Sequence, residues 1–294
     1  MNDLTKEISW RWSGKTVEFG IDRLGSGPLV LLLAALSSIS TRREMWPLQS
    51  HLASNYETIA VDWPGFGDRA KPQVDWRPEA YSAFLDHLVT RVAPRPFATC
   101  AAGHASAYVL AQAVARPGSL GRLCLIAPTW RGPLPTMTGK PKEVFQWIVR
   151  AVDRPLLGPI LYKLNVNPLI VRMMARGHVY ADPSWLTASR LADKLMVTTS
   201  NGARHASARF VTGALDKMTS RDEFLSLAAH VTDPILVLYG AATPPKSKAE
   251  MEALGGLKNV RAIELPSGKL AVHEEFPIDT ASALKALLME GPRR

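Results

Sequence analysis

The sequence contains little cysteine: among its 294 residues there are two, Cys100 and Cys124. Both lie inside apolar segments, where a thiol packs as a small hydrophobic side chain, and two cysteines are too few for a disulfide-rich secreted scaffold. No apolar run approaches the roughly 18 residues of a membrane-spanning helix. The first residues, MNDLTKEISWRW, also lack the apolar core of a secretory signal. These absences predict a cytoplasmic protein without a transmembrane segment.

Clustered positive charge is also missing, although the formal net charge is +9. The lysines and arginines are scattered, with no run of five or six and no aromatic platform beside them, so we expect no nucleic-acid partner. No zinc-ligand spacing is present, and we expect neither a metal nor a cofactor. With 47% hydrophobic and 21% charged residues, the composition is typical of a globular domain with a substantial core. The oligomeric state is left open.

What the sequence does contain is an alternation of strand and helix patterns. Residues 6–12 and 15–25 alternate polar and apolar side chains around a Ser13-Gly14 turn and predict an edge hairpin. Apolar runs at 29–36, 56–65, 97–102, 121–128, 234–240 and 260–268 predict buried strands. Helical patterns separate them at 40–53, 78–92, 105–116, 247–256 and 279–288. In the first of these helices, Ser40 or Thr41 would be the N-cap, and Glu44 would complete a capping box. Strands alternating with helices indicate a mostly parallel sheet in a three-layer α/β fold.

Between the fourth and fifth strands of the parallel run, the pattern becomes proline-rich and helical, with no strong strand signal. We therefore expect residues 129–223 to form a helical cap insertion, and residues 1–128 and 224–294 to form the core domain. Several apolar side chains of the cap recur at helical spacing and are expected to be buried against the sheet domain: Phe145, Trp147, Ile148, Leu156, Leu157, Ile160 and Leu161.

The segment DWPGFGDRAKP, residues 62–72, is similar to the D-x-P-G-x-G-x-S loop of esterases, dehalogenases and epoxide hydrolases. Together with the order of the elements, it makes the chain from about Lys6 to Leu288 resemble the α/β-hydrolase superfamily. The resemblance implies a three-layer α/β-hydrolase fold with a cap, and hydrolytic machinery at four places along the chain.

The first of these places is the nucleophile elbow, a strained turn between a strand and a helix that needs small residues two positions before and after its centre. The segment GHASA, residues 103–107, satisfies this demand when it is centred on Ala105, with Gly103 and Ala107 as the small neighbours. Centring it on Ser106 would place His104 and Tyr108 there, and both are too bulky. The resemblance therefore implies that Ala105 occupies the nucleophile position, with the backbone amide of Ser106 in the oxyanion hole.

The other three places are substituted as well. Ala34 and Ala35 stand where an H-G pair shapes the oxyanion hole, which leaves the amide of Leu36 as a possible donor. Thr243 stands at the acid position, and a threonine cannot stabilise an imidazolium as a carboxylate does. Lys269 stands at the base position.

His273 lies four residues beyond the base position, and we interpret it as a surface or supporting residue rather than a replacement base. Lys269 is expected to project into the pocket, where it could bind an anionic group, act as a base or form a Schiff base, unless it extends to solvent. Leu36, Ser37, His104, Ser106 and Arg204 are the other candidates for contact with a ligand. Arg204 could bind a carboxylate or phosphate, or remain a solvated helix charge.

These substitutions predict a pseudoenzyme with a degenerate catalytic triad, which binds a small hydrophobic or amphipathic ligand or a protein partner. The alternative is an enzyme with altered chemistry, a lyase, isomerase or cyclase, that uses Lys269 in the same pocket. The sequence leaves open whether the protein is an enzyme at all, but it argues against ordinary serine hydrolysis, because loss of the nucleophile and its base removes most of the rate enhancement.

Overall fold

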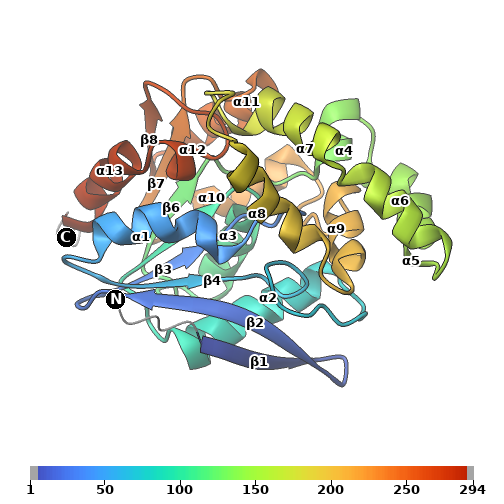
Figure 1. The fold of residues 1–294 in the computed structure, drawn as a ribbon. Helices are drawn as coiled ribbons and strands as arrows, with labels where there is room; N and C mark the ends of the chain where they lie inside the picture. The colour runs from blue at the N-terminus through green and yellow to red at the C-terminus, as the bar shows by residue number, and fades with distance from the viewer. Residues whose placement is uncertain (1–5, 290–294) are drawn as a thin grey trace.

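The structure, a computed structural model, describes residues 6–289. One eight-stranded sheet runs through the molecule in the order β1-β2-β4-β3-β5-β6-β7-β8 (Figure 1). Its strands are β1 (Lys6–Trp12), β2 (Lys15–Leu24), β3 (Leu29–Leu33), β4 (Glu57–Val61), β5 (Ala98–Ala102), β6 (Arg122–Ile126), β7 (Ile235–Gly240) and β8 (Val260–Leu265). β2 pairs antiparallel with β1 and β4, and every other pairing is parallel. The predicted hairpin, strands and mostly parallel sheet are confirmed.

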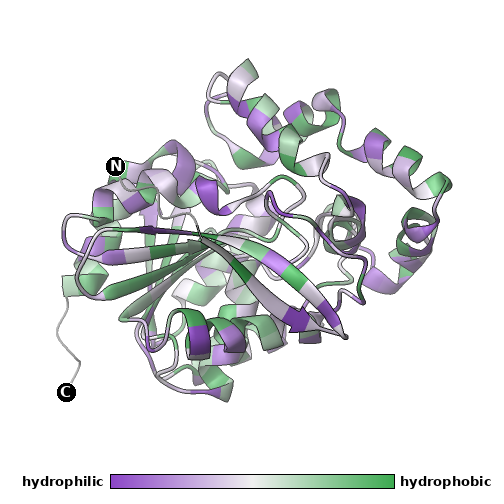
Figure 2. Ribbon diagram, turned by 60° about the horizontal axis from the view of Figure 1, so that its bottom comes forward, coloured by the Kyte–Doolittle hydropathy of each residue, from purple (hydrophilic) through white to green (hydrophobic). Residues whose placement is uncertain are grey.

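Helices cover both faces of this sheet. One face carries α2 (Pro78–His87), α3 (Ala105–Ala115), α10 (Arg221–His230) and α11 (Pro245–Gly255), and the other carries α1 (Trp46–Leu52), α12 (Val272–Glu275) and α13 (Pro277–Met289). Side chains of a strand alternate between the two faces, so Leu31 of β3 joins one hydrophobic cluster and Leu32 the other. Figure 2 shows the hydrophobic character of the central strands, which explains their uninterrupted apolar sequence.

The loop that follows β4 carries the D-x-P-G-x-G motif and is held by a buried charge cluster. Arg42 forms ion pairs with Asp22, Asp62 and Asp68. Burial raises the pKa of Asp62 to about 6, although the guanidinium opposes this. Gly67 has a φ of 72°, and a β-carbon there would lie 2.3 Å from Cγ of Asp62. The second glycine of the motif is therefore required by both backbone conformation and space.

Between β6 and α10 the chain forms a set of helices that lies to one side of the sheet (Figure 1). They are α4 (Pro133–Thr138), η3 (Lys142–Phe145), α5 (Gln146–Asp153), α6 (Leu157–Asn165), α7 (Pro168–Met174), η4 (Ala175–Val179), α8 (Ala188–Thr198) and α9 (Ala203–Val211). Residues 127–220, all of which are described, contain no strand. The division into a cap at 129–223 and a core on either side of it stays a prediction.

The cap packs differently from the expectation that its apolar side chains are buried against the sheet domain. Phe145 is buried, but Trp147 is 64% exposed, Leu156 87%, Leu157 45% and Ile160 60%. The reason is the face that α6 turns inward. No helix among the described residues is long and apolar enough to cross a membrane.

Helix α6 approaches its neighbours through Gly158 and Tyr162. A β-carbon at Gly158 would lie 2.0 Å from the carbonyl oxygen of Val152 in α5, and Tyr162 packs with Val166 and Ala203. Residues four apart share one face of a helix. The inward face therefore consists of these two positions, and the apolar stripe that contains Ile160 is left on the outside.

Candidate functional site

The sharp turn between β5 and α3 is centred on Gly103, not on Ala105 as the sequence analysis expected. Gly103 has a φ of 52°, in the left-handed region, and lies directly between the last residue of β5 and the start of α3. Ala105 is the first residue of α3 and is fully buried. Ala101 and Ala105 supply the small residues two positions before and after the turn. The residue with left-handed backbone at this turn is therefore a glycine, which has neither a hydroxyl nor a thiol.

A large cavity of about 880 Å³ opens in front of this turn. Three of the predicted ligand contacts, Leu36, Ser37 and His104, line it together with Gly103 and Ala35. The cap supplies most of the opposite side, with these residues: Asn165, Val166, Ile170, Val171, Met174, Ala175, His178 and Val179. Most of the lining side chains are apolar, which is typical of a site for a hydrophobic molecule.

His104 lines this cavity and is buried beside a carboxyl group. Its Nε2 lies 3.4 Å from Oδ1 of Asp216. Burial lowers the pKa of His104 to about 4 and raises that of Asp216 to about 7. Asp216 also accepts a hydrogen bond of 2.9 Å from the amide of Gly132. Because burial disfavours the charged form of both groups, the pair is best described as neutral near pH 6 and fixes the start of the cap to the core.

The remaining predicted site residues lie outside the cavity lining. Ser106 is buried and donates its hydroxyl to the carbonyl oxygen of Ala101 at 3.3 Å. Thr243 is buried after β7, and its Oγ1 has no hydrogen-bond partner within residues 6–289. Neither side chain is placed to act on a molecule in the cavity.

Two basic side chains expected to contact a ligand are instead bonded to the backbone of the cap. Lys269 does not project into the cavity, because its Nζ donates to the carbonyl oxygen of Arg176 at 2.6 Å. Arg204 donates from Nε to the carbonyl oxygen of Val152 at 3.1 Å. Lys269 therefore bonds to the cap from the segment after β8, whereas Arg204 joins two helices of the cap, α9 and α5.

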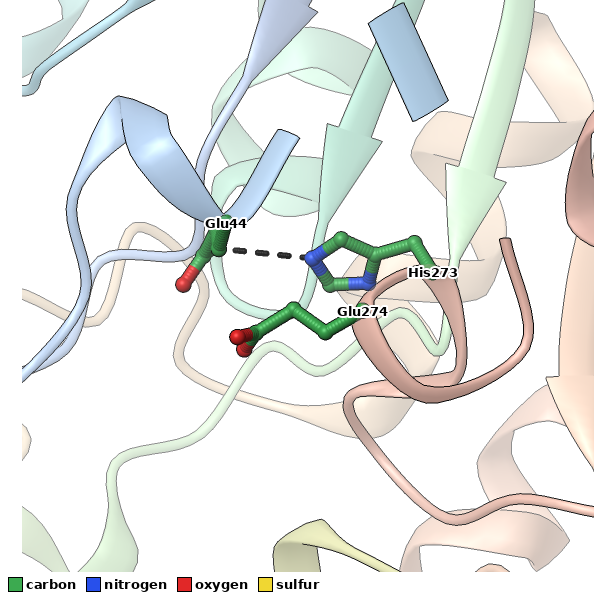
Figure 3. A group of neighbouring side chains, drawn as sticks. All are labelled: Glu44, His273 and Glu274. Carbon is green, nitrogen blue, oxygen red and sulfur yellow. Dashed lines mark ion pairs between the residues drawn. The ribbon is translucent and has the colours of Figure 1, made fainter. Parts of the chain in front are cut away.

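His273 is the residue whose position differs most from expectation. It is 2% exposed and lines the cavity, whereas the sequence suggested a surface or supporting histidine. Figure 3 shows its ring directed toward Glu44, whose Oε1 lies 3.8 Å from Nε2. Within the described part of the chain, neither ring nitrogen has a hydrogen-bond partner. Two unpaired nitrogens on a buried ring are costly in the absence of a ligand or water.

Glu44 was expected to complete a capping box, but its carboxylate turns into the site. Thr41 alone provides the N-cap, by accepting a hydrogen bond from the amide of Arg43. Oε1 of Glu44 accepts the amide of Ala35 at 2.6 Å. Burial alone would raise the pKa of Glu44, but His273 and Lys194 outweigh burial and hold it below the ordinary value. The negative charge of this buried carboxylate is therefore favoured by the basic groups beside it.

Glu274 completes this group with a second carboxylate and its own cation. Its Oε1 lies 3.1 Å from Nζ of Lys194 and accepts a hydrogen bond of 3.0 Å from the hydroxyl of Tyr180. One ligand atom each from Glu44, His273 and Glu274 lies within 4.8 Å of the others, which is close enough to hold a metal ion. However, the ammonium of Lys194 already neutralises one carboxylate, so the site has its positive charge without a metal.

The sequence contains only weak signals for this group. Glu44 is an acidic residue between the buried strand β3 and the apolar side chains of α1, and the pair His273-Glu274 follows β8 where the resemblance places a base. Each signal alone has a simpler explanation, a helix cap or a solvated loop. Their meaning depends on contact between segments far apart in the sequence.

The comparisons agree with this fold. The sequence model of the alpha/beta hydrolase family matches residues 30–283. A hydrolase from Pseudomonas aeruginosa PA01 is 15% identical, with 97% of this chain and 99% of that chain covered and a TM-score of 0.72. Cfl2 from Burkholderia cenocepacia is 19% identical, with 97% and 96% covered and a TM-score of 0.73. A thermophilic esterase from Thermogutta terrifontis is 17% identical, with 97% of each chain covered and a TM-score of 0.69. No curated protein matches the sequence.

The chain therefore belongs to the alpha/beta hydrolase family. These three structures are each less than 20% identical to it, so they establish the fold alone.

Proposed function

We propose that this protein binds a small, largely apolar molecule in the cavity between sheet and cap, and that it does not form an acyl-enzyme intermediate. The observation that carries the proposal is the glycine at the elbow: Gly103 faces a cavity of about 880 Å³ and offers no nucleophile. Cavities of this size suit drug-sized ligands. The substitution of the acid position by Thr243 supports the same conclusion.

The open cavity favours a small ligand over a protein partner as its occupant. If side chains filled the site, a role in partner binding would be the better explanation. Here the space extends from Ala35 and Gly103 to the cap residues Ile170 and Met174. A ligand there would be enclosed on both sides, and the apolar lining matches the hydrophobic or amphipathic ligand expected from the sequence.

The second candidate function, an enzyme with altered chemistry, is favoured by the histidines that line the cavity rather than by Lys269. Lys269 is bonded to a cap carbonyl and lies outside the cavity lining. His273 lines the cavity with both ring nitrogens unpaired among residues 6–289, beside the carboxylate of Glu44. Three histidines, His104, His178 and His273, line the cavity and are the candidates for proton transfer in this second function.

The test uses two neighbouring positions on α7. Ile170 is half-buried and lines the cavity, whereas Leu169 is 78% exposed and does not. In Ile170→Trp the larger side chain should fill part of the cavity, and in the matched control Leu169→Trp it should extend into solvent. Native mass spectrometry of the purified wild type should show a co-purifying small molecule that Leu169→Trp retains and Ile170→Trp loses.

A ligand retained equally by both variants would place its site elsewhere and contradict the proposal. The absence of acyl chemistry is tested separately with a fluorophosphonate, which labels activated serines. We expect no labelling of the wild type. Labelling mapped to a serine that lines the cavity, such as Ser37, would restore the hydrolase interpretation.

A further inference from the structure

Helices α6 and α7 of the cap expose large apolar side chains to solvent. The exposed fraction is 61% for Leu164 of α6 and 63% for Met173 of α7, although side chains of these types are usually buried. We call the exposed apolar residues on and beside these two helices the outer cap surface: Leu156, Leu157, Ile160, Leu164, Leu169 and Met173. A group of exposed apolar side chains on one surface is typical of an interaction site.

The outer cap surface forms a stripe on each of the two helices. Leu157, Ile160 and Leu164 follow one another at intervals of three and four residues, so they share the face of α6 opposite to the one that packs on α5 and α9. In Figure 1, α6 lies at the edge of the molecule away from the sheet. On α7, Leu169 and Met173 are four residues apart, whereas residues 170–171 between them line the cavity. Helix α7 therefore has the cavity on one side and the outer cap surface on the other.

The charged residues around the outer cap surface are almost all basic. Between residues 146 and 176 the sequence has these lysines and arginines: Arg150, Arg154, Lys163, Arg172 and Arg176. All five are exposed, and none has an ion-pair partner among residues 6–289. The single acidic residue of the same range, Asp153, already pairs with His205 and Arg209. The outer cap surface thus combines exposed apolar side chains with uncompensated positive charge.

We propose that the outer cap surface docks the protein on a membrane of anionic lipids, with α6 and α7 lying along the membrane surface. The apolar side chains enter the boundary between the headgroups and the acyl chains, as those of amphipathic interfacial helices do. The basic side chains beside them pair with the anionic headgroups. This proposal goes beyond the proposed function, because docking depends on the outer residues alone and does not require a ligand in the cavity.

Charge and exposure both favour a membrane over a protein as the partner. A two-fold dimer places the same surface of two copies in contact, so the basic side chains of one copy would face those of the other without a free carboxylate from residues 146–176 between them. Leu156 and Leu169 are 87% and 78% exposed, so they protrude from the cap. A protein partner would need matching pockets for them, whereas the fluid surface of a membrane accommodates them without any.

The position of α7 gives docking a consequence for the cavity. Ile170 and Met174 line the cavity from the same helix whose Leu169 and Met173 face outward. A docked protein therefore has its cavity within about one helix diameter, roughly 10 Å, of the membrane. Apolar molecules concentrate in the acyl chains rather than in water, so docking places the cavity beside a source of such molecules.

The experiment measures co-sedimentation of the purified protein with vesicles of phosphatidylcholine that contain phosphatidylserine, and with vesicles of phosphatidylcholine alone. The wild type should bind the anionic vesicles more tightly, and added salt should weaken this binding. Ile160→Ser should lower the affinity about tenfold, because one apolar side chain no longer enters the membrane. The matched control is Ile278→Ser: Ile278 is 65% exposed, as against 60% for Ile160, but belongs to α13 on the other side of the molecule (Figure 1). This control should bind as the wild type does.

A second pair of variants tests the charge. Lys163→Gln removes one cation beside the outer cap surface and should lower the affinity for anionic vesicles about fivefold. Lys258→Gln makes the same change in net charge at another place, because Lys258 is exposed and directly precedes β8, at the opposite edge of the sheet from the cap. Its affinity should equal that of the wild type. Thermal unfolding confirms that each variant is folded, and Leu169→Ser replaces Ile160→Ser if the latter is not.

Several results would overturn the proposal. Wild-type protein that binds neither kind of vesicle, or both equally, would do so, and so would equal binding by Ile160→Ser and Ile278→Ser. A dimer in sedimentation equilibrium that Ile160→Ser dissociates would assign the outer cap surface to a second copy of the chain. Binding to poly-glutamate as tight as binding to the anionic vesicles would assign it to an acidic protein. Ligand retention is measured separately by native mass spectrometry, so a failure of vesicle binding leaves the proposed function in place.

Discussion

The clearest test of the elbow compares the same substitution at two glycines with left-handed backbone. Gly103 has a φ of 52° and Gly67 a φ of 72°, so alanine is strained at both. The space around the two positions differs. A β-carbon at Gly103 would lie 3.4 Å from Cβ of Ala35 and 3.9 Å from Oγ1 of Thr129, which are ordinary contacts. At Gly67 it would lie 2.3 Å from Cγ of Asp62.

The expected losses follow from these contacts. Left-handed backbone costs a residue other than glycine about 1–2 kcal/mol, and Gly103→Ala should lose about that much stability. Gly67→Ala carries the same strain and must also move the carboxylate of Asp62 away from Arg42, with which it forms a buried ion pair. Disrupting such a pair costs about 3–5 kcal/mol, so the total should be at least about 4 kcal/mol.

Thermal unfolding followed by circular dichroism is the assay. With about 2–4 °C per kcal/mol for a chain of this size, Gly103→Ala should unfold a few degrees below the wild type and Gly67→Ala at least about 8 °C below it. Equal losses would refute the reasoning, because they would mean that the turn at Gly103 has no room for a side chain. The smaller loss at Gly103 would show that the turn has room for a side chain.

The same turn predicts where a hydroxyl becomes reactive. Gly103→Ser should present its side chain to the cavity, whereas Ala105→Ser should bury it, since Ala105 is fully buried and absent from the cavity lining. Even so, Gly103→Ser should remain below an esterase kcat/KM of about 10⁴ M⁻¹s⁻¹, a typical lower value for enzymes, because Thr243 supplies no carboxylate. Faster hydrolysis of p-nitrophenyl esters would show that the scaffold still supports acyl transfer.

Three further outcomes are expected. Burial raises the pKa of Asp216 from 3.8 to about 7, so the folded state binds this proton more tightly than the unfolded state. The free energy of unfolding therefore falls as pH rises from about 4 to 7. Asp216→Asn should raise the melting temperature more at pH 8 than at pH 5, and an equal shift at both pH values would contradict the raised pKa. Arg42→Met should lower stability by about 3–5 kcal/mol, because it leaves the carboxylate of Asp62 buried without its cation. The side chain of Arg43 is half-exposed, so Arg43→Met should lower stability by under about 1 kcal/mol in thermal unfolding. Leu156→Ser should change stability by no more than about 0.5 kcal/mol, because this side chain is 87% exposed; a larger loss in the same assay would show that the outer face of the cap is covered.

The sequence by itself determined the strands and their arrangement. A strand covered on both faces needs apolar side chains at consecutive positions, and an edge hairpin needs alternation around a turn. Both patterns are local, so they can be recognised without knowledge of neighbours. The runs that became β3, β5 and β7 were predicted for this reason.

The register of the elbow was not determined by sequence. Small residues flank Gly103 at Ala101 and Ala105, and they flank Ala105 at Gly103 and Ala107, so the steric rule is satisfied twice. Only the end of β5 and the φ of Gly103 distinguish the two registers. Where a strand ends depends on its pairing with β3 and β6, which is a property of the sheet.

The outer face of the cap illustrates the same division. The spacing of Leu157, Ile160 and Leu161 predicted a helix with one apolar face, and α6 forms there, but spacing alone does not say which neighbour covers that face. The close approach at Gly158 turned that side outward. Sequence periodicity fixes which residues share a helix face, and tertiary packing decides which way that face points.

The group formed by Glu44, His273 and Glu274 was decided entirely by tertiary structure. Glu44 in its own segment satisfies the pattern of a helix cap, and His273 in its own segment resembles a loop residue. Their side chains meet because α12 packs against α1 and η1 (Arg42–Met45) on one face of the sheet, an arrangement set by hydrophobic burial of α1 and α13 rather than by the polar residues themselves. Local sequence determined the elements of this protein; burial of their apolar faces placed the carboxylate of Glu44 and the imidazole of His273 together in one cavity.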